Sequence, residues 1–134
     1  MTSERPVDRV WAALAERLGD DLRAVSRYGP SGYETRARDD VDARYSDDEE
    51  DEVFDSVVLE QMNLASVERS FKLGSLTSVV QVFDDAWVVI APDSLAGKSG
   101  VLVSVDRPGD DVTMADVDWI CDFLDSELED TLAE

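Results

Sequence analysis

The stretch LTSVVQVFDDAWVVIAPDSLAGKSGVLVSV, residues 76–105, decides the fold of this 134-residue chain. Its Val, Trp, Phe and Ile residues gather in three runs, Leu76 to Phe83, Ala86 to Ala91 and Val101 to Val105. Such residues favour β-strands, and Asp84-Asp85 leaves room only for a tight turn between the first two runs. The runs are continuous rather than alternating, which is typical of strands covered on both faces or buried at an interface. The stretch therefore predicts three consecutive strands.

Before these strands the chain predicts a helix and then a hairpin. A helix over about 4–18 is indicated by apolar residues at helical spacing, with Gly19 as its stop. The residues with that spacing are Val7, Val10, Trp11, Leu14 and Leu18. Strands are predicted at 21–28 and 33–38, because Gly-Pro-Ser-Gly at 29–32 has the chemistry of a turn.

Two further helices are predicted from their capping residues. Ser46 and Glu49 form a capping-box pattern that predicts a helix over about 46–67, and the acidic run 47–52 is interpreted as its solvated first turn. Thr113, with Asp116 three residues later, opens the last helix in the same way. The apolar stripe of that helix is Val117, Ile120, Cys121, Leu124, Leu128 and Leu132.

The predicted element order is α-ββ-α-βββ-α. This order describes an α+β fold, an antiparallel sheet of about five strands with helices packed on it. The length suits one compact domain with its own core, so we expect a single acidic domain over residues 1–134.

The net charge of the chain limits the classes of molecule that it can bind. The chain has 32 Asp plus Glu against 12 Lys plus Arg, a formal charge of −20 with a sequence pI of about 4.1. A general basic surface for nucleic acid or an anionic membrane is therefore excluded. Ten of the 12 cations are Arg, and this composition resembles that of cytoplasmic proteins of salt-in haloarchaea, with an ordinary acidic mesophilic protein as the alternative. Met1 leads into Thr-Ser-Glu-Arg-Pro without an apolar targeting segment, so we expect a cytoplasmic protein.

The element order also resembles that of the roadblock, or dynein light-chain-like, domain, which belongs with the profilin-like and longin-like architectures. The resemblance covers nearly the whole chain. It implies a homodimer or heterodimer formed by sheet extension and helix packing, often serving a small GTPase or a multi-protein scaffold. The sequence is also similar to a family of small uncharacterised haloarchaeal proteins. The segments that carry this similarity are Gly19 to Arg23, Tyr33 with Arg36 to Val41, and Tyr45 to Asp47. That second resemblance implies no activity.

Five arginines on the hairpin and its exit are the candidate anion-binding residues. They are Arg23, Arg27, Arg36, Arg38 and Arg44. Strand periodicity places Arg36 with Arg38 on one face, and places Arg23 and Arg27 together as well. Arginine clusters hold carboxylates and phosphates through paired hydrogen bonds. The alternative, which we favour, is that they pair with nearby carboxylates such as Glu34, Asp39 and Asp40 and neutralise local repulsion.

Catalytic, metal and cofactor chemistry find little support. The chain has no His and one Cys, Cys121. It therefore lacks the residues of a Ser-His-Asp catalytic triad or a Cys-His catalytic dyad, and it also lacks the ligands of a structural zinc site. Ala96 to Ser99 imitates the end of a phosphate-binding loop, but Pro92 stands where the first Gly is needed and a strand follows instead of a helix. We expect no catalytic residue, no metal and no cofactor.

The expected function is a non-catalytic interaction or regulatory module that acts through self-association or a protein partner. The alternative is a small-molecule or anion sensor that uses the arginine-rich hairpin. Four apolar residues are interface candidates, with packing in the monomer core as the favoured alternative for each. They are Trp87, Val89, Trp119 and Phe123.

The excess of carboxylates predicts that the fold depends on salt. In molar salt the Debye length falls to about 3 Å, which suppresses the repulsion that −20 charges impose on a compact state. We expect the far-UV circular dichroism spectrum to lose its folded form as KCl is removed. A spectrum that stays native in millimolar salt would contradict this prediction.

Overall fold

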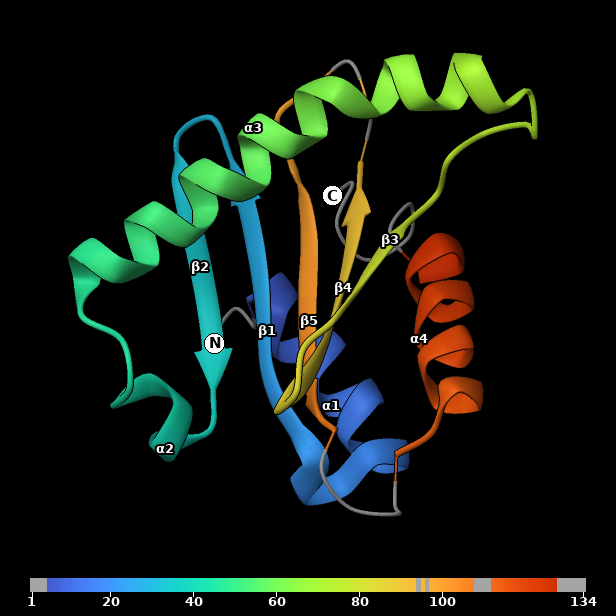
Figure 1. The fold of residues 1–134 in the computed structure, drawn as a ribbon. Helices are drawn as coiled ribbons and strands as arrows, with labels where there is room; N and C mark the ends of the chain where they lie inside the picture. Colours follow the sequence, from blue (N-terminus) through green and yellow to red (C-terminus); the bar gives the residue numbers. More distant parts are fainter. Residues whose placement is uncertain (1–4, 94, 96, 108–111, 128–134) are drawn as a thin grey trace.

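The computed structural model describes residues 5–93, 95, 97–107 and 112–127, and it contains one sheet with helices on both faces (Figure 1). In chain order the elements are α1 (Pro6–Leu18), the 3-10 turn η1 (Gly19–Asp21), β1 (Leu22–Gly29), β2 (Gly32–Ala37), α2 (Asp39–Asp42), α3 (Asp47–Phe71), β3 (Val79–Val82), β4 (Ala86–Pro92), β5 (Gly100–Asp106) and α4 (Met114–Glu127). Among the described helices none has both the length and the apolar character that crossing a membrane requires.

The sheet has five strands in the order β2-β1-β5-β4-β3, and every neighbouring pair is antiparallel. The predicted α+β fold with an antiparallel five-stranded sheet is therefore confirmed. The two β segments of the chain join where β1 pairs with β5, with Val25 opposite Val103. The short helix α2 was not predicted, because a single turn has no apolar periodicity to reveal it.

One face of the sheet packs against α1 and α4; in Figure 1, α1 lies behind the strands and α4 is seen to their right. Alternate residues of β5, such as Val101, Val103 and Val105, point into this layer and are almost fully buried. The helices contribute the periodic residues that the sequence indicated. They are Val7, Val10, Leu14 and Leu18 of α1 and Val117, Ile120 and Leu124 of α4. Leu128 and Leu132, predicted to continue the last stripe, lie outside the described residues.

Among the described elements, α3 crosses the opposite face obliquely (Figure 1), and α2, with Val41 buried, lies at the border of this face. A second, smaller apolar cluster forms beneath α3 from Tyr28, Phe54, Val57, Ile90 and Leu102. At its start the predicted capping box is present, since the Ser46 side chain accepts from the Glu49 N–H and Glu49 accepts from the Ser46 N–H. The hydrogen bond from the Ser46 backbone lowers the pKa of Glu49, which keeps this carboxylate charged at the positive end of the helix.

A buried polar residue anchors the middle of α3 to the sheet. Gln61 is 1% exposed. Its Oε1 accepts from the Tyr28 hydroxyl at 2.6 Å, and its Nε2 donates to the carbonyl oxygens of Gly97 and Ser99 at 3.1 and 3.2 Å. One side chain therefore ties the helix to β1 and to the connection between β4 and β5.

Replacing Gln61 by Met keeps the volume but removes every one of these hydrogen bonds. The Tyr28 hydroxyl and the Gly97 carbonyl would lose this partner, whereas the Ser99 carbonyl still accepts from the Asp93 N–H at 3.0 Å, so we expect the free energy of unfolding to fall by about 2 kcal/mol. Urea denaturation in molar KCl measures it. Asn63→Met, an exposed position on the same helix, is the control, and equal losses for the two variants would contradict the anchoring role.

Candidate functional site

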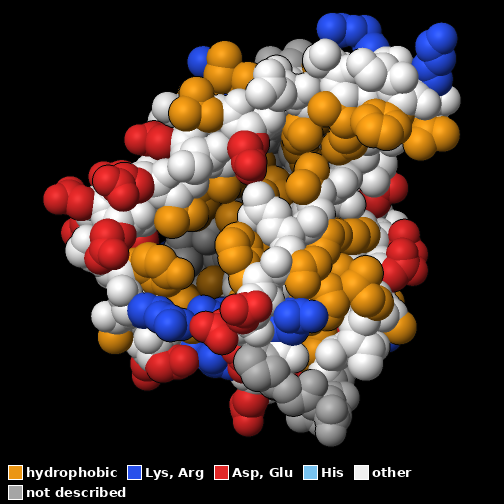
Figure 2. All heavy atoms as spheres, in the orientation of Figure 1, with side chains coloured by type: hydrophobic (Ala, Val, Ile, Leu, Met, Phe, Trp, Pro, Cys, Tyr) orange, Lys and Arg blue, Asp and Glu red, His pale blue; other side chains and the backbone are white. Residues whose placement is uncertain are grey.

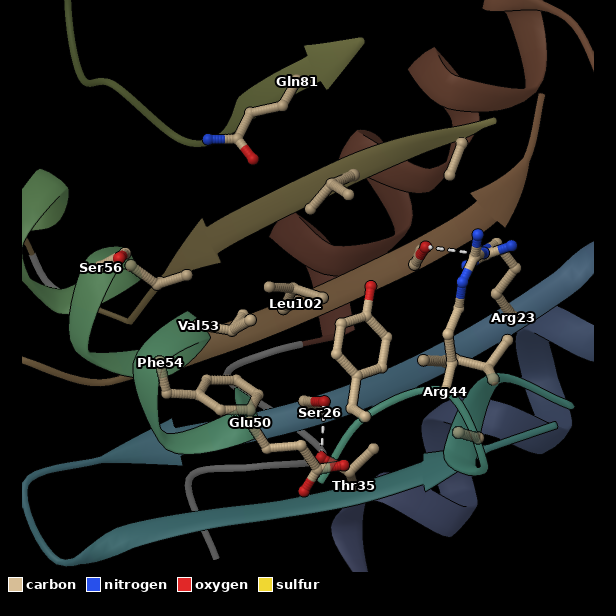
Figure 3. Close-up of a pocket in the computed structure, with 18 of the residues that line it drawn as sticks. Arg23, Ser26, Thr35, Arg44, Glu50, Val53, Phe54, Ser56, Gln81 and Leu102 are labelled. Atoms are coloured by element: carbon tan, nitrogen blue, oxygen red, sulfur yellow. Dashed lines mark hydrogen bonds between the residues drawn. The ribbon is translucent and has the colours of Figure 1, made fainter. Parts of the chain in front are cut away.

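A cleft of about 870 Å³ opens where α3 leaves the sheet uncovered. Figure 2 shows it as a hollow lined by apolar side chains, and Figure 3 shows its lining residues. Its floor comes from β1, β5 and β4, through residues such as Ala24, Leu102 and Val88. One wall is formed by α2 and the first half of α3, and the other by the end of β3 and the turn into β4.

An irregularity in β1 brings Arg23 into the cleft. The register with β5 shifts between Leu22 and Ala24, so that two β1 residues stand opposite one residue of β5. Leu22 belongs to the core beneath α1, whereas Arg23 lines the cleft. Arg27 is in regular register and shares the face of Val25, on the side of α1. The expectation that Arg23 and Arg27 share a side is therefore wrong, because the bulge interrupts the alternation.

Asp106, at the end of β5, binds two of the hairpin arginines. Its Oδ1 accepts from Arg23 Nη1 at 3.2 Å, and its Oδ2 accepts from Arg38 Nη1 at 2.6 Å. Arg23 also donates from Nε to Ser104 Oγ at 3.2 Å, and Arg38 donates from Nε to Asp40 at 3.0 Å. The hydrogen bonds to Asp106 and then to Asp40 raise the pKa of Arg38, so this guanidinium stays charged at every pH at which the protein is folded.

The other hairpin arginines lie apart from this network. Arg36 sits over the Trp11 ring, with its Cζ 5.0 Å from the ring centre, and donates to Asp8 at 3.4 Å. Arg36 therefore contacts α1, whereas Arg38 contacts Asp40 and Asp106. The two arginines, which we expected on one face of the strand, do not meet at a common group. Arg44 is exposed and lines the cleft without an ion pair among the described residues. The cleft thus collects Arg23 and Arg44 from the five candidates.

Two of the four interface candidates are buried in the monomer. Trp87 and Val89 point from β4 into the layer beneath α1 and α4, at 8% and 0% exposure, so they offer no surface to a partner. Trp119 and Phe123 lie half-buried on α4, with their rings stacked at 5.5 Å, and Arg17 lies 4.6 Å over the Trp119 ring. These contacts join α4 to α1.

Several exposed apolar residues lie at the end of α3 and on the edge strand β3; those of α3 are on one side of the sheet, and Val82, which is opposite Trp87, points to the other side. We call the following four residues the edge surface: Val67 and Phe71 at the end of α3, Leu73 after it, and Val82 on β3. Their exposed fractions are 38%, 66%, 83% and 55%. Figure 2 shows apolar side chains beneath this end of α3 and over β3. Sequence reasoning missed the edge surface, since the apolar residues of a strand do not reveal that the strand lies at an edge.

Among the described residues, no group of three or more His, Cys, Asp or Glu is placed to hold a metal ion. The acidic run at the start of α3 serves as a helix cap, through Glu49, and as a partner for the Tyr33 hydroxyl, which donates to Asp51 at 2.9 Å.

An antiparallel five-stranded sheet with α3 on one face and α1 and α4 on the other is a roadblock-like fold. The crystal structure of MglC from Myxococcus xanthus has the same arrangement, with a TM-score of 0.52 over 92% of this chain and 97% of that chain. The two sequences are 14% identical, so the likeness is one of fold. The chain belongs to the family described as "Domain of unknown function (DUF7522)", whose model matches residues 8–125. No curated protein matches it.

The shared carboxylate of Asp106 is expected to be a strong determinant of stability. Asp106→Asn would leave Arg23, which is 8% exposed, without its counter-charge, and we expect the free energy of unfolding to fall by about 2 to 3 kcal/mol. The control is Asp40→Asn, whose side chain is 69% exposed, so its solvent-screened pair with Arg38 should contribute much less. Urea denaturation at constant KCl compares them. A loss no larger than that of the control would show that solvent compensates Arg23.

Proposed function

We propose that this protein is a non-catalytic interaction module of a high-salt cytoplasm, and that two copies associate edge to edge through β3. The observation that supports the proposal is the coincidence of an unpaired strand edge with the exposed apolar residues of the edge surface. The roadblock-like fold supports the same reading, because sheet extension and helix packing are what the resemblance implies.

The two edges of the sheet differ in character. β2 is an edge strand that exposes charged residues, Glu34 and Arg36, and charges of this kind discourage pairing with another strand. β3 instead presents Val82 and is followed by Phe83, which is 53% exposed. Its outer backbone N–H and C=O groups have no strand partner among the described residues. An edge without charged residues is a template for a further strand.

Self-association is favoured because one surface would serve both copies. When two β3 strands pair antiparallel about a twofold axis, the same residues meet from both sides, which makes the interface closed and self-complementary. The ends of α3, with Val67 and Phe71, would lie next to their counterparts across that axis. Their apolar area would leave water on association, which is the main favourable contribution to such contacts.

The net charge sets the condition for association. Each copy carries −20, so two copies repel one another in dilute buffer. Molar salt shortens the range of that repulsion to about 3 Å and leaves the apolar contacts intact. The dimer is therefore expected to form at the same high salt that supports the fold.

Val82→Glu is predicted to convert the dimer into a monomer. The variant places a carboxylate at the end of each β3 strand, where a charge on the edge discourages pairing with another strand. Size exclusion with light scattering in molar KCl should give about twice the chain mass of 14.8 kDa for the unmodified protein and one chain mass for the variant.

Met114→Glu is the matched control, because Met114 is 58% exposed but lies on α4 outside the edge surface. It should remain a dimer. A monomeric unmodified protein at every concentration tested would contradict the proposal, and so would a Val82→Glu variant that remains dimeric.

A further inference from the structure

We propose that the cleft beside α3 binds a small carboxylic acid with an apolar tail, whose carboxylate meets Arg23 and Arg44 and whose tail lies on Phe54, Val57 and Leu102. This inference is independent of edge-to-edge association, since it rests on the cleft and not on the edge surface. It selects two of the five hairpin arginines as ligand-binding residues.

The first support is the unfinished hydrogen bonding of Arg23. This residue is 92% buried, because its exposed fraction is 8%. Its Nε and Nη1 atoms donate to Ser104 and Asp106, but Nη2 has no hydrogen-bond partner among the described residues. A guanidinium has donors in a fixed planar arrangement that matches the two oxygens of a carboxylate. Because Arg23 lines the cleft, its Nη2 group can donate a hydrogen bond to one more anionic oxygen there.

The second support is the position of the two arginines that line the cleft. Arg23 and Arg44 lie together at one end of it (Figure 3), and Arg44 makes no ion pair among the described residues. Four carboxylates also line the cleft, and none of them is ion-paired with either arginine among the described residues. They are those of Asp42, Glu50, Glu60 and Asp85. Because these carboxylates repel a dianion more strongly than a monoanion, a monocarboxylate suits the cleft better than a phosphate dianion.

The third support is the chemistry of the rest of the cleft. Figure 3 shows Arg23 and Arg44 at one end and Phe54 at the other, with Leu102 between them. Phe54, Val57 and Leu102 belong to the apolar cluster beneath α3, and the Ser26 and Thr35 hydroxyls at the side are already bonded to each other at 2.8 Å. The volume of about 870 Å³ lies in the range of small-molecule sites, about 300 to 1,000 Å³. A ligand with one anionic end and one apolar end fits this polarity.

Octanoate is the probe, titrated into the isotope-labelled protein in molar KCl below its micelle concentration and followed by amide shifts in NMR spectra. We expect shifts confined to residues around the cleft, such as Ser26, Phe54 and Ser104. Octanol, which has the tail without the charge, and acetate, which has the charge without the tail, should each bind at least about tenfold more weakly, because each lacks one of the two contacts.

Arg44→Gln should weaken octanoate binding about tenfold, since one charge-assisted hydrogen bond is lost. Arg69→Gln is the control, because Arg69 is an exposed arginine on α3 that does not line the cleft. It should bind as the unmodified protein does. Val82→Glu should also bind octanoate normally, which separates this site from the proposed dimer. Equal affinities of Arg44→Gln and Arg69→Gln would overturn the proposal, and so would octanol binding as tightly as octanoate or the absence of shifts at the cleft.

Discussion

The pairing of β1 with β5 is the contact on which the remaining structure depends. It joins the N-terminal hairpin to the three strands that follow α3, and so converts two local β segments into one sheet. The same pairing defines the layers on either side, because Val25 and Val103 then face α1 together. At its end the register shift places Arg23 next to Ser104 and Asp106. Both the core and the charged end of the cleft therefore follow from one strand pair.

The oblique crossing of α3 explains why this protein has two candidate surfaces rather than one. The helix is held at its middle by Gln61 and covers the sheet around Phe54 and Val57. A straight helix of 25 residues that crosses a sheet at an angle cannot cover the face evenly. On one side it leaves the cleft, and at its far end it leaves Phe71 exposed beside the free strand edge. The position in which Gln61 holds α3 therefore affects both the cleft and the edge surface.

Sequence patterns predicted the helices and strands, but they did not predict which distant residues contact one another. Helical spacing, the capping box at Ser46 and the β-rich runs are local signals, and they predicted the element order and the fold class. The ion pair of Arg23 with Asp106 joins residues 83 positions apart, and no local pattern encodes such a separation. Asp40, two residues from Arg38, was within reach of local reasoning. The bulge at Arg23 could not be foreseen either, because strand periodicity assumes regular pairing.

The charge of −20 limits the kinds of recognition that are open to this protein. In the high-salt cytoplasm that we propose, charges more than about 3 Å apart are screened, so long-range electrostatic attraction would not steer a partner toward a particular face. What remains effective is contact at short range, through apolar area removed from water and hydrogen bonds made in partly enclosed places. The two candidate surfaces have these properties. The edge surface is apolar next to unpaired backbone, and the cleft sets a buried arginine beside an apolar floor. Glu49 and Asp116 accept hydrogen bonds from the backbone at the starts of α3 and α4. Part of the acidity therefore stabilises helix ends, and recognition is left to apolar contact and to hydrogen bonds from Arg23.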